Sequence, residues 1–461
     1  MVLKKDSPRI EKLKKKARRQ SITEGIFASA KTSFGEYYVA PFAIAINSSN
    51  SLVALLSSVS GLLGPLSQTF SSRLIGKYSR KKIILKTVLG EALMWLPFIL
   101  IAILFYKGIF VNALPFLLLV SFVIFTIFAN LSSPVWFSWI GDIVEEKHRG
   151  RWFSKRNLIL GFVAVVLAIS ASFFLDAFTK KGWMIFGFII LFSLALIFRL
   201  LSWKVFKKQY EPKLKLEKTD YFSFWDFLKE APKTNFGRFA IFRATLFFSA
   251  YVTASLFAVY LLRILGFSYK IYMLIIFAST IYSLVFLGIW GKFADKYGNC
   301  KVLYITSALI PLIPILWILS PNPIYLMIVP ALAGGIYSAG FSLAVGNFIY
   351  DNVSPQKRGP AVSYFNILNG IGVFLGAGLG AILIKVIPAS PIDAIKIIFI
   401  IGAVLRAIPV FFFLPKLKEI KKTKKFKGLK EFKDIFLKEA KPTLMEEVHE
   451  VASISKYLHI K

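Results

Sequence analysis

The sequence predicts an all-α membrane protein in which twelve transmembrane helices form two six-helix bundles of the same design. Three observations lead to this fold class. Of 461 residues, 56% are hydrophobic and only 18% are charged, which is too apolar for an ordinary soluble domain. The apolar residues form long runs near the span length of about 20 residues. Two charged motifs also occur once in each half of the chain, so the halves look like parallel repeats.

The apolar runs give the expected positions of the helices. We predict spanning helices at residues 22–46, 51–74, 83–106, 113–141, 155–178, 183–205, 237–263, 271–291, 302–319, 323–349, 360–386 and 393–415. The predicted organisation is a basic N-terminus (1–21), a first bundle (22–205), a linker (206–236), a second bundle (237–415) and a basic tail (416–461).

Lysine and arginine are unequally divided between the segments that connect these helices. The segments on the side of the N-terminus hold 47 of them, and those on the other side hold 7. Positive charge is retained on the cytoplasmic side. We therefore expect both termini and the linker in the cytoplasm, in a multi-pass protein of the plasma membrane with an even number of helices. The apolar run that follows the basic N-terminus has no small-residue cleavage site, so no cleaved signal peptide is expected.

Composition argues against several other classes of protein. The net charge of +34 lies beside apolar runs and not in a patch with base-reading aromatics, so we expect no nucleic-acid partner. A single cysteine, Cys300, excludes an intramolecular disulfide framework, and three scattered histidines make no metal site. The sequence has no paired acids or histidine cluster that would indicate an enzyme. It has no phosphate-binding loop that would indicate nucleotide binding. We expect no cofactor and no metal.

The first repeated motif is a short charged hairpin between two apolar runs. Gly291, Asp295, Lys296 and Gly298 spell G-x-x-x-D-K-x-G. Gly291 would allow close approach of a neighbour, Gly298 would adopt a left-handed turn, and Asp295 would suit the positive end of a helix. This pattern resembles the signature hairpin of the major facilitator superfamily. A degenerate echo, Ser72–Lys81, lies about 219 residues earlier and lacks the acid.

The second motif has the same internal spacing in both halves. Asp142 precedes Arg149 and Gly150, and 209 positions later Asp351 precedes Arg358 and Gly359. Each Asp ends an apolar helix, where the helix dipole disfavours an anion, so the Arg seven residues on is the expected partner. The Gly would then permit the next helix to start.

The resemblance implies secondary transport of a small solute by alternating access, with the first, fourth, seventh and tenth helices around a central cavity. Ionisable groups inside a membrane are costly and are functional candidates by default. The candidate substrate and coupling residues on these helices are Lys31, Glu36, Tyr38, Asn130, Trp136, Arg243, Tyr251, Tyr337 and Asn347. Glu91 lies on a helix expected at the periphery, where a structural role is favoured.

Glu36 is the candidate for proton coupling. It lies near mid-depth in the first helix, and its side chain is too short to reach either surface. Lys31 is five residues away, about 140° around an α-helix. A cation from the seventh helix, such as Arg243, is therefore the easier partner.

Several points stay open at this level. Lys31 and Arg243 would suit an anionic or zwitterionic solute, whereas the Tyr and Trp residues would suit a sugar or an aromatic one. The direction of transport is not legible, and a non-transporting sensor on the same scaffold is the alternative function. We expect a monomer that contacts anionic lipids through its basic segments, including an amphipathic stretch in the linker (221–228) and the Lys-rich tail.

One further pattern concerns packing. Gly372, Gly376 and Gly380 recur at every fourth position of the eleventh predicted helix. This spacing predicts a bare face that a neighbouring helix can approach closely.

Overall fold

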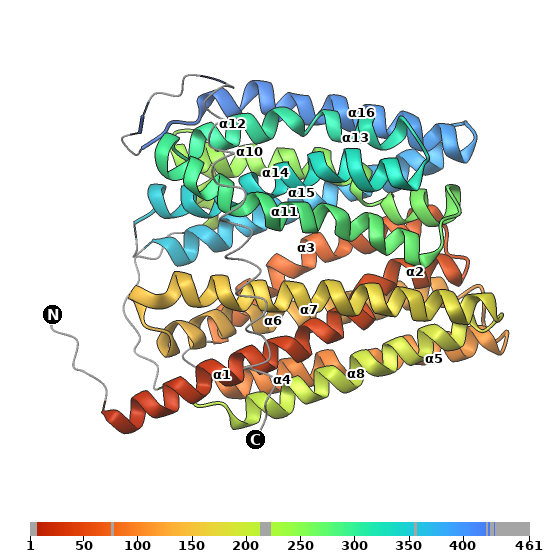
Figure 1. Ribbon diagram of the computed structural model, residues 1–461, viewed down its shortest axis with the longest axis horizontal. Coiled ribbons are helices and arrows are strands. Elements are labelled where there is room, and N and C mark those ends of the chain that lie inside the picture. Colours follow the sequence, from red (N-terminus) through yellow and green to blue (C-terminus); the bar gives the residue numbers. More distant parts are fainter. Residues whose placement is uncertain are drawn as a thin grey trace. The chain divides into compact units, whose positions relative to one another are not determined.

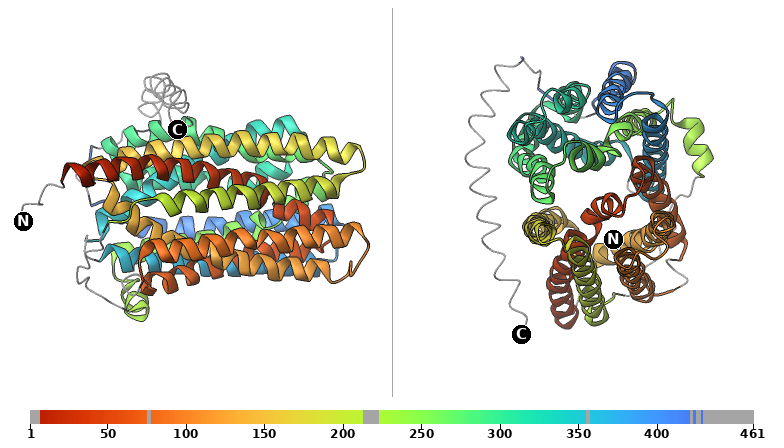
Figure 2. Two further views of the ribbon diagram at one scale, coloured as in Figure 1. Left: turned by 90° about the horizontal axis from the view of Figure 1, so that it is seen from below. Right: turned by 90° about the vertical axis from the view of Figure 1, so that its right-hand side faces the viewer.

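The computed structural model describes residues 7–74, 78–212, 223–354, 357–420, 423–424 and 428. This part of the chain is built from helices and divides into two compact units. Unit 1 comprises the described residues of Met1–Asn47 and Leu66–Glu217, and unit 2 comprises those of Ser48–Pro65 and Lys218–Glu447. In the right-hand view of Figure 2 the helices are seen nearly end-on, and within each unit they run roughly along one direction.

Unit 1 contains eight helical segments and the last part of α3, whose first part belongs to unit 2. They are α1 (Pro8–Lys31), the π-helix η1 (Thr32–Glu36), α2 (Tyr37–Ala45), α4 (Arg80–Leu93), α5 (Trp95–Tyr106), α6 (Leu114–Ile143), α7 (Glu146–Lys180) and α8 (Met184–Lys208). Figure 1 shows α1, α7 and α8 side by side, and α8 also packs against α4 and α5.

Unit 2 holds the remaining elements. They are α9 (Phe224–Glu230), α10 (Asn235–Ala254), the π-helix η2 (Val259–Ile264), α11 (Tyr269–Tyr297), α12 (Asn299–Leu309), α13 (Leu312–Ile318), α14 (Pro323–Asn352), α15 (Arg358–Val386), α16 (Pro391–Phe412) and the 3₁₀ turn η3 (Leu414–Lys416). Helix α10 packs against both α15 and α16, and α11 packs along α14.

The helices confirm the predicted all-α membrane fold. In the described part of the chain, eleven segments are long and apolar enough to cross a membrane, and each coincides with a predicted span. The remaining prediction, 22–46, is helical as the second part of α1 followed by η1 and α2. Its charged side chains, among them Glu24, Lys31 and Glu36, make it more polar than the others.

Helix α3 (Asn50–Leu74) begins in unit 2, because its first turns pack on α15. The Ser51 hydroxyl donates to the Ala381 carbonyl at 2.9 Å, and the Ser58 hydroxyl donates to the Phe374 carbonyl at 2.8 Å. A Cβ on Gly370 would lie 2.4 Å from the Gly61 carbonyl oxygen. These small residues let the two backbones approach closely.

The hairpin between α11 and α12 bears out one expectation for its glycines and contradicts the other. Gly298 has φ of +90°, the left-handed conformation that favours glycine. Gly291 does not serve close approach, since a Cβ there would meet only Leu343 at 3.7 Å, an ordinary contact. Asp295 is exposed on α11, and its interaction with the positive end of a helix stays a prediction.

The ends of equivalent helices are joined in the same way in the two units. In unit 1, buried Arg80 at the start of α4 donates to the Asp142 carboxylate at the end of α6, at 2.7 Å. In unit 2, Asn299 at the start of α12 donates to the Asp351 carboxylate at the end of α14, at 2.8 Å. The donors are 219 positions apart and the acceptors 209, so the duplicated sequence makes duplicated contacts.

These contacts change the account of the second motif. Asp142 and Asp351 have partners from the preceding hairpin, which the sequence analysis did not foresee. The side chains of Arg149 and Arg358 lie outside the described residues, as does any detail of Gly150 and Gly359. Their pairing with the acids stays a prediction.

The linker helix α9, in the stretch predicted to be amphipathic, packs within unit 2 through Phe227. Buried Phe227 contacts Phe236 and Tyr364, whereas Trp225 is exposed. The helix starts with a capping box, in which the Asp226 N–H donates to the Ser223 hydroxyl and the Ser223 N–H donates to the Asp226 carboxylate. The Ser223 hydroxyl also donates to this carboxylate, and these bonds lower the pKa of Asp226. Tyr221, and the tail beyond residue 428, lie outside the described residues.

The predicted glycine face on α15 is confirmed and yields a test. A Cβ on Gly376 would lie 2.1 Å from the Phe248 carbonyl oxygen of α10, and Gly372 and Gly380 face α10 equally closely. Gly376→Ala must push the two helices apart, so we expect a clear fall in the melting temperature of the purified protein. Gly378→Ala is the matched control, since its Cβ would find Ser58 at 3.7 Å. Equal melting temperatures for the two variants would contradict this packing.

Candidate functional site

The strongest concentration of buried charge is in unit 1. Three acids and three bases from α1, η1, α4, α7 and α8 meet in the interior of the unit, and they balance in number when all are ionised. The members of this charge network are Glu24, Lys31, Glu36, Glu91, Arg156 and Arg199.

Lys31 and Glu36 form an ion pair, which corrects the expectation that they face apart. The chain between them is a π-helical turn, closed by a hydrogen bond from the Tyr37 N–H to the Thr32 carbonyl. A bond between residues five apart widens the turn, so side chains five positions apart come to the same face. The 140° of a regular α-helix does not apply here, and Glu36 needs no partner from the seventh helix.

The π-turn is held in place by its neighbours. Gly35 leaves room for the Trp95 ring, since a Cβ there would lie 2.2 Å from it. The Ser33 hydroxyl donates to the Ala164 carbonyl of α7 at 3.0 Å, and the Tyr38 hydroxyl donates to the Ala168 carbonyl at 2.7 Å. Tyr38 is fully buried, and this bond ties α2 to α7.

Glu91 bridges two of the bases. One carboxylate oxygen lies 2.7 Å from the Lys31 Nζ, and the other lies 2.5 Å from the Arg199 Nη2. The Glu91 side chain is 1% exposed, and that of Lys31 is 7% exposed. Glu36 is the most open acid of the network, with a side chain 35% exposed. Glu91 therefore lies at the centre of the network, and Glu36 lies at its accessible edge.

Glu24 is held more loosely. Its carboxylate lies 3.5 Å from Arg156 and 3.8 Å from Arg199, and it accepts a hydrogen bond from the Ser202 hydroxyl at 3.2 Å. It borders a small pocket of about 180 Å³. The pocket is lined by Glu24, Ala28, Ser132, Ser133, Trp136, Arg156, Arg199 and Phe206.

Trp136 and Asn130 take different places on α6. The Arg156 guanidinium lies over the Trp136 ring at 4.4 Å, and the indole N–H is buried without a hydrogen-bond partner. Trp136 thus contributes an unsatisfied donor to the pocket wall. Asn130 is already engaged, since it donates to the Thr126 carbonyl at 2.9 Å and accepts from Gln68 at 3.2 Å.

Unit 2 carries buried positive charge of a different kind. Arg243 on α10 stacks near two rings, with its guanidinium carbon 4.8 Å from the Phe247 ring and 5.0 Å from the Phe365 ring. Its Nε is buried without a hydrogen-bond partner. Tyr251 and Tyr337 lie close enough to interact electrostatically with the guanidinium.

A second arginine reaches α10 from α16. Arg406 is 7% exposed, and it donates to the Ala250 carbonyl at 3.0 Å and to the Thr253 hydroxyl. Gly402, one turn earlier, lets α16 approach Thr253, since a Cβ there would lie 2.3 Å from it. The Arg406 Nε also lacks a partner. Tyr337 interacts electrostatically with both guanidinium groups.

These two cations, Arg243 and Arg406, have no acidic partner among the described residues. The reason is visible in the sequence, because the apolar spans of unit 2 contain no Asp or Glu between residues 235 and 294, 302 and 350, or 394 and 418. Burying a charged side chain costs at least about 2.5 kcal/mol on insertion scales. Unit 2 thus keeps two positive charges that no acid of its own offsets.

Asn347, another predicted site residue, has a structural partner instead. Its amide donates to the Asn299 side-chain oxygen at 3.1 Å, next to the Asn299–Asp351 contact. It therefore belongs to the joint between α12 and α14.

The sequence comparisons agree with this architecture. The family model of the Major Facilitator Superfamily matches residues 25–258 and 239–445, nearly the whole chain. The chain belongs to the major facilitator superfamily. This family consists of transporters, and the chain is accordingly a multi-pass membrane protein and a secondary transporter of small solutes. No curated protein matches the sequence.

Solved structures share the fold of this superfamily member at low sequence identity. The nucleoside transporter NupG is 15% identical, with a TM-score of 0.64 over 87% of this chain and 99% of that one. A bacterial homologue of the iron transporter ferroportin, in its inward-facing state, is 13% identical, with a TM-score of 0.64 over 87% and 98%. At this identity the likeness extends to the fold.

Sequence reasoning missed four ionisable residues of these clusters. All four lie inside predicted spans: Glu24 in the first, and Arg156, Arg199 and Arg406 in spans that are not among the four expected to line the cavity. The signal that identifies them is an ionisable side chain inside an apolar span, whichever helix carries it.

The network predicts unequal effects of two similar substitutions. Glu91→Gln leaves Lys31 and Arg199 short of their shared buried anion, which should cost roughly 3–5 kcal/mol. Glu36→Gln leaves Lys31 paired with Glu91 and should cost much less. We expect the melting temperature of purified Glu91→Gln to fall well below that of Glu36→Gln. The account of the network is wrong if Glu36→Gln is destabilised as strongly.

Proposed function

We propose that this superfamily member transports a small anion by alternating access, with coupling to protons. The observation that carries the choice of substrate class is the unpaired positive charge of Arg243 and Arg406 in unit 2. A bound anionic solute would offset the free-energy cost of burying these two charges without an acidic partner. A carboxylate or a phosphate fits best, because guanidinium groups bind both through paired hydrogen bonds.

The aromatic surroundings favour the same class. Tyr251 and Tyr337 carry hydroxyls within electrostatic range of Arg243, and a phenol can donate a hydrogen bond to an anion. A neutral sugar would leave both arginines uncompensated. The alternatives of a sugar, an aromatic or a zwitterionic substrate thus have less support than a small anion.

Proton coupling is assigned to Glu36. It is the most exposed acid of the charge network, and Lys31 next to it keeps Glu91 as a second counter-ion when Glu36 is neutral. Protonation there would change the charge of the network by one without leaving a base unpaired. Transport, and not signalling or catalysis, is the proposed activity, in a plasma-membrane monomer with cytoplasmic termini.

Transport by reconstituted protein tests the substrate class. Proteoliposomes should exchange small carboxylates or phosphates, and neutral sugars of similar size should not compete. Arg243→Met should lower anion exchange at least tenfold. Arg238→Met on the same helix should leave it nearly unchanged, because among the described residues the Arg238 guanidinium bonds to the Pro232 carbonyl alone. Exchange of neutral solutes alone, unaffected by Arg243→Met, would overturn the proposal.

The coupling role of Glu36 is tested with an imposed pH gradient. In Glu36→Gln, gradient-driven accumulation should vanish while exchange at equal pH continues, because the substrate site is intact and the proton site is lost. Glu11→Gln is the matched control, because Glu11 lies on the preceding helix α1 and pairs with Arg18 outside the network. A Glu36→Gln variant that still accumulates substrate in proportion to the gradient would remove Glu36 from the mechanism.

A further inference from the structure

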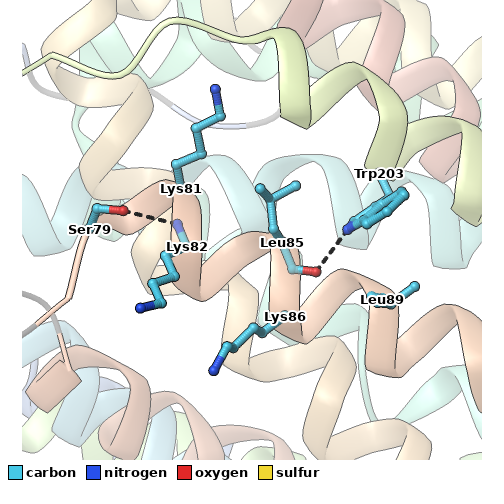
Figure 3. A pocket seen from close by; sticks show the side chains of 7 residues that line it. All are labelled: Ser79, Lys81, Lys82, Leu85, Lys86, Leu89 and Trp203. Atoms are coloured by element: carbon cyan, nitrogen blue, oxygen red, sulfur yellow. Dashed lines mark hydrogen bonds between the residues drawn. The ribbon is translucent and has the colours of Figure 1, made fainter.

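A second feature of unit 1 is a groove between α4 and α8, which no residue of the charge network lines. It has a volume of about 400 Å³ and is shown in Figure 3. It is lined by Ser79, Lys81, Lys82, Leu85, Lys86, Leu89 and Trp203. Its wall is tied across the two helices by the Trp203 indole N–H, which donates to the Leu85 carbonyl at 3.0 Å.

The groove is strongly basic. Lys82 and Lys86 are exposed and extend to the same side of α4 in Figure 3, and neither has an acidic partner among the described residues. Lys207 adds a third positive charge, with its Nζ 3.6 Å from the centre of the Trp203 ring. Lys82 lies over the Tyr78 ring, with its Nζ 5.7 Å from the ring centre. The groove therefore presents positive charge that no described acid neutralises beside an amphipathic aromatic side chain, the combination found where proteins meet lipid headgroups.

An acid beside Lys81, Glu211, is already engaged. The Glu211 carboxylate accepts from the Lys81 backbone N–H at 3.3 Å and lies 3.8 Å from Arg80. The Lys81 Nζ in turn donates to the Gln209 carbonyl at 3.1 Å. Lys81 is thus held by the protein, whereas Lys82 and Lys86 remain for a ligand.

An apolar stripe continues from the two lysines. Lys82, Lys86, Leu89, Leu93, Leu96 and Leu100 follow one another at intervals of three or four residues along α4 and α5. This spacing places them on one helical face. Leu93, Leu96 and Leu100 are exposed by 47%, 48% and 55%. From Leu89 to Leu100 the stripe is about 16 Å long, roughly half the thickness of a bilayer core.

We propose that this groove binds one anionic phospholipid. Its phosphate lies against Lys82 and Lys86, and an acyl chain follows the leucine stripe. The site has a charged end and an apolar stripe about as long as one leaflet, which matches the headgroup and acyl chain of a lipid. A free phosphate would contact the lysines but not the leucines. The site is separate from the transport residues, so its occupancy does not depend on the proposed substrate.

Native mass spectrometry of the delipidated full-length protein tests this site. The protein is offered phosphatidylglycerol and phosphatidylcholine of equal chain length. We expect one phosphatidylglycerol to bind preferentially, and Lys82→Gln with Lys86→Gln to weaken it roughly 25-fold, since each lysine near an anionic headgroup contributes about fivefold. The control variant, Lys180→Gln with Lys181→Gln at the C-terminal end of α7, removes the same charge from residues that do not line the groove and should change binding less than twofold.

Three outcomes would overturn the proposal. The first is equal binding of the two lipids by the wild-type protein, and the second is equal loss in the two double variants. The third is binding of glycerol 3-phosphate as tight as that of phosphatidylglycerol, which would indicate a site for free phosphate. Melting temperatures of both double variants should match the wild type, because all four lysines are exposed.

Discussion

The cost of keeping an ionised side chain away from water governs both functional clusters. In unit 1 this cost is offset within the unit, because each base of the charge network pairs with at least one acid. In unit 2, Arg243 and Arg406 have no acid beside them among the described residues, and their surroundings are aromatic rings, hydroxyls and backbone carbonyls. A balanced network can change protonation with little disturbance, whereas an unbalanced pair attracts an anion from outside. In the proposed transport cycle, unit 1 would therefore take up the proton and unit 2 would bind the anion.

The two halves of the sequence are alike at the contacts that join helix ends, but they differ at the candidate transport residues. Arg80 with Asp142 and Asn299 with Asp351 make the same kind of contact at equivalent places. The acids of the charge network have no counterparts within the apolar spans of unit 2. This divergence is what gives the two repeats different electrostatics on a common frame.

The fold could be predicted almost completely from the sequence, because hydrophobic length and charge asymmetry are strong signals in membrane proteins. The site could be predicted only in part. Lys31, Glu36 and Arg243 were found as ionisable residues within spans, but the pairing of Lys31 with Glu36 depends on a π-turn that no residue pattern in the sequence announces. The position of Glu91 at the centre of the network depends on packing between α1, α4 and α8. Contacts between residues on different helices cannot be inferred from the periodicity of the sequence.

The most direct test of the central claim is the thermal shift of purified wild-type protein and Arg243→Met with matched anionic and neutral solutes. Arg243 donates no hydrogen bond to another described residue, so replacing it removes an unpaired buried charge. The account predicts a melting temperature for ligand-free Arg243→Met equal to or above that of the wild type, together with loss of stabilisation by small anions. A variant that melts well below the wild type, yet is still stabilised by the same anions, would contradict it.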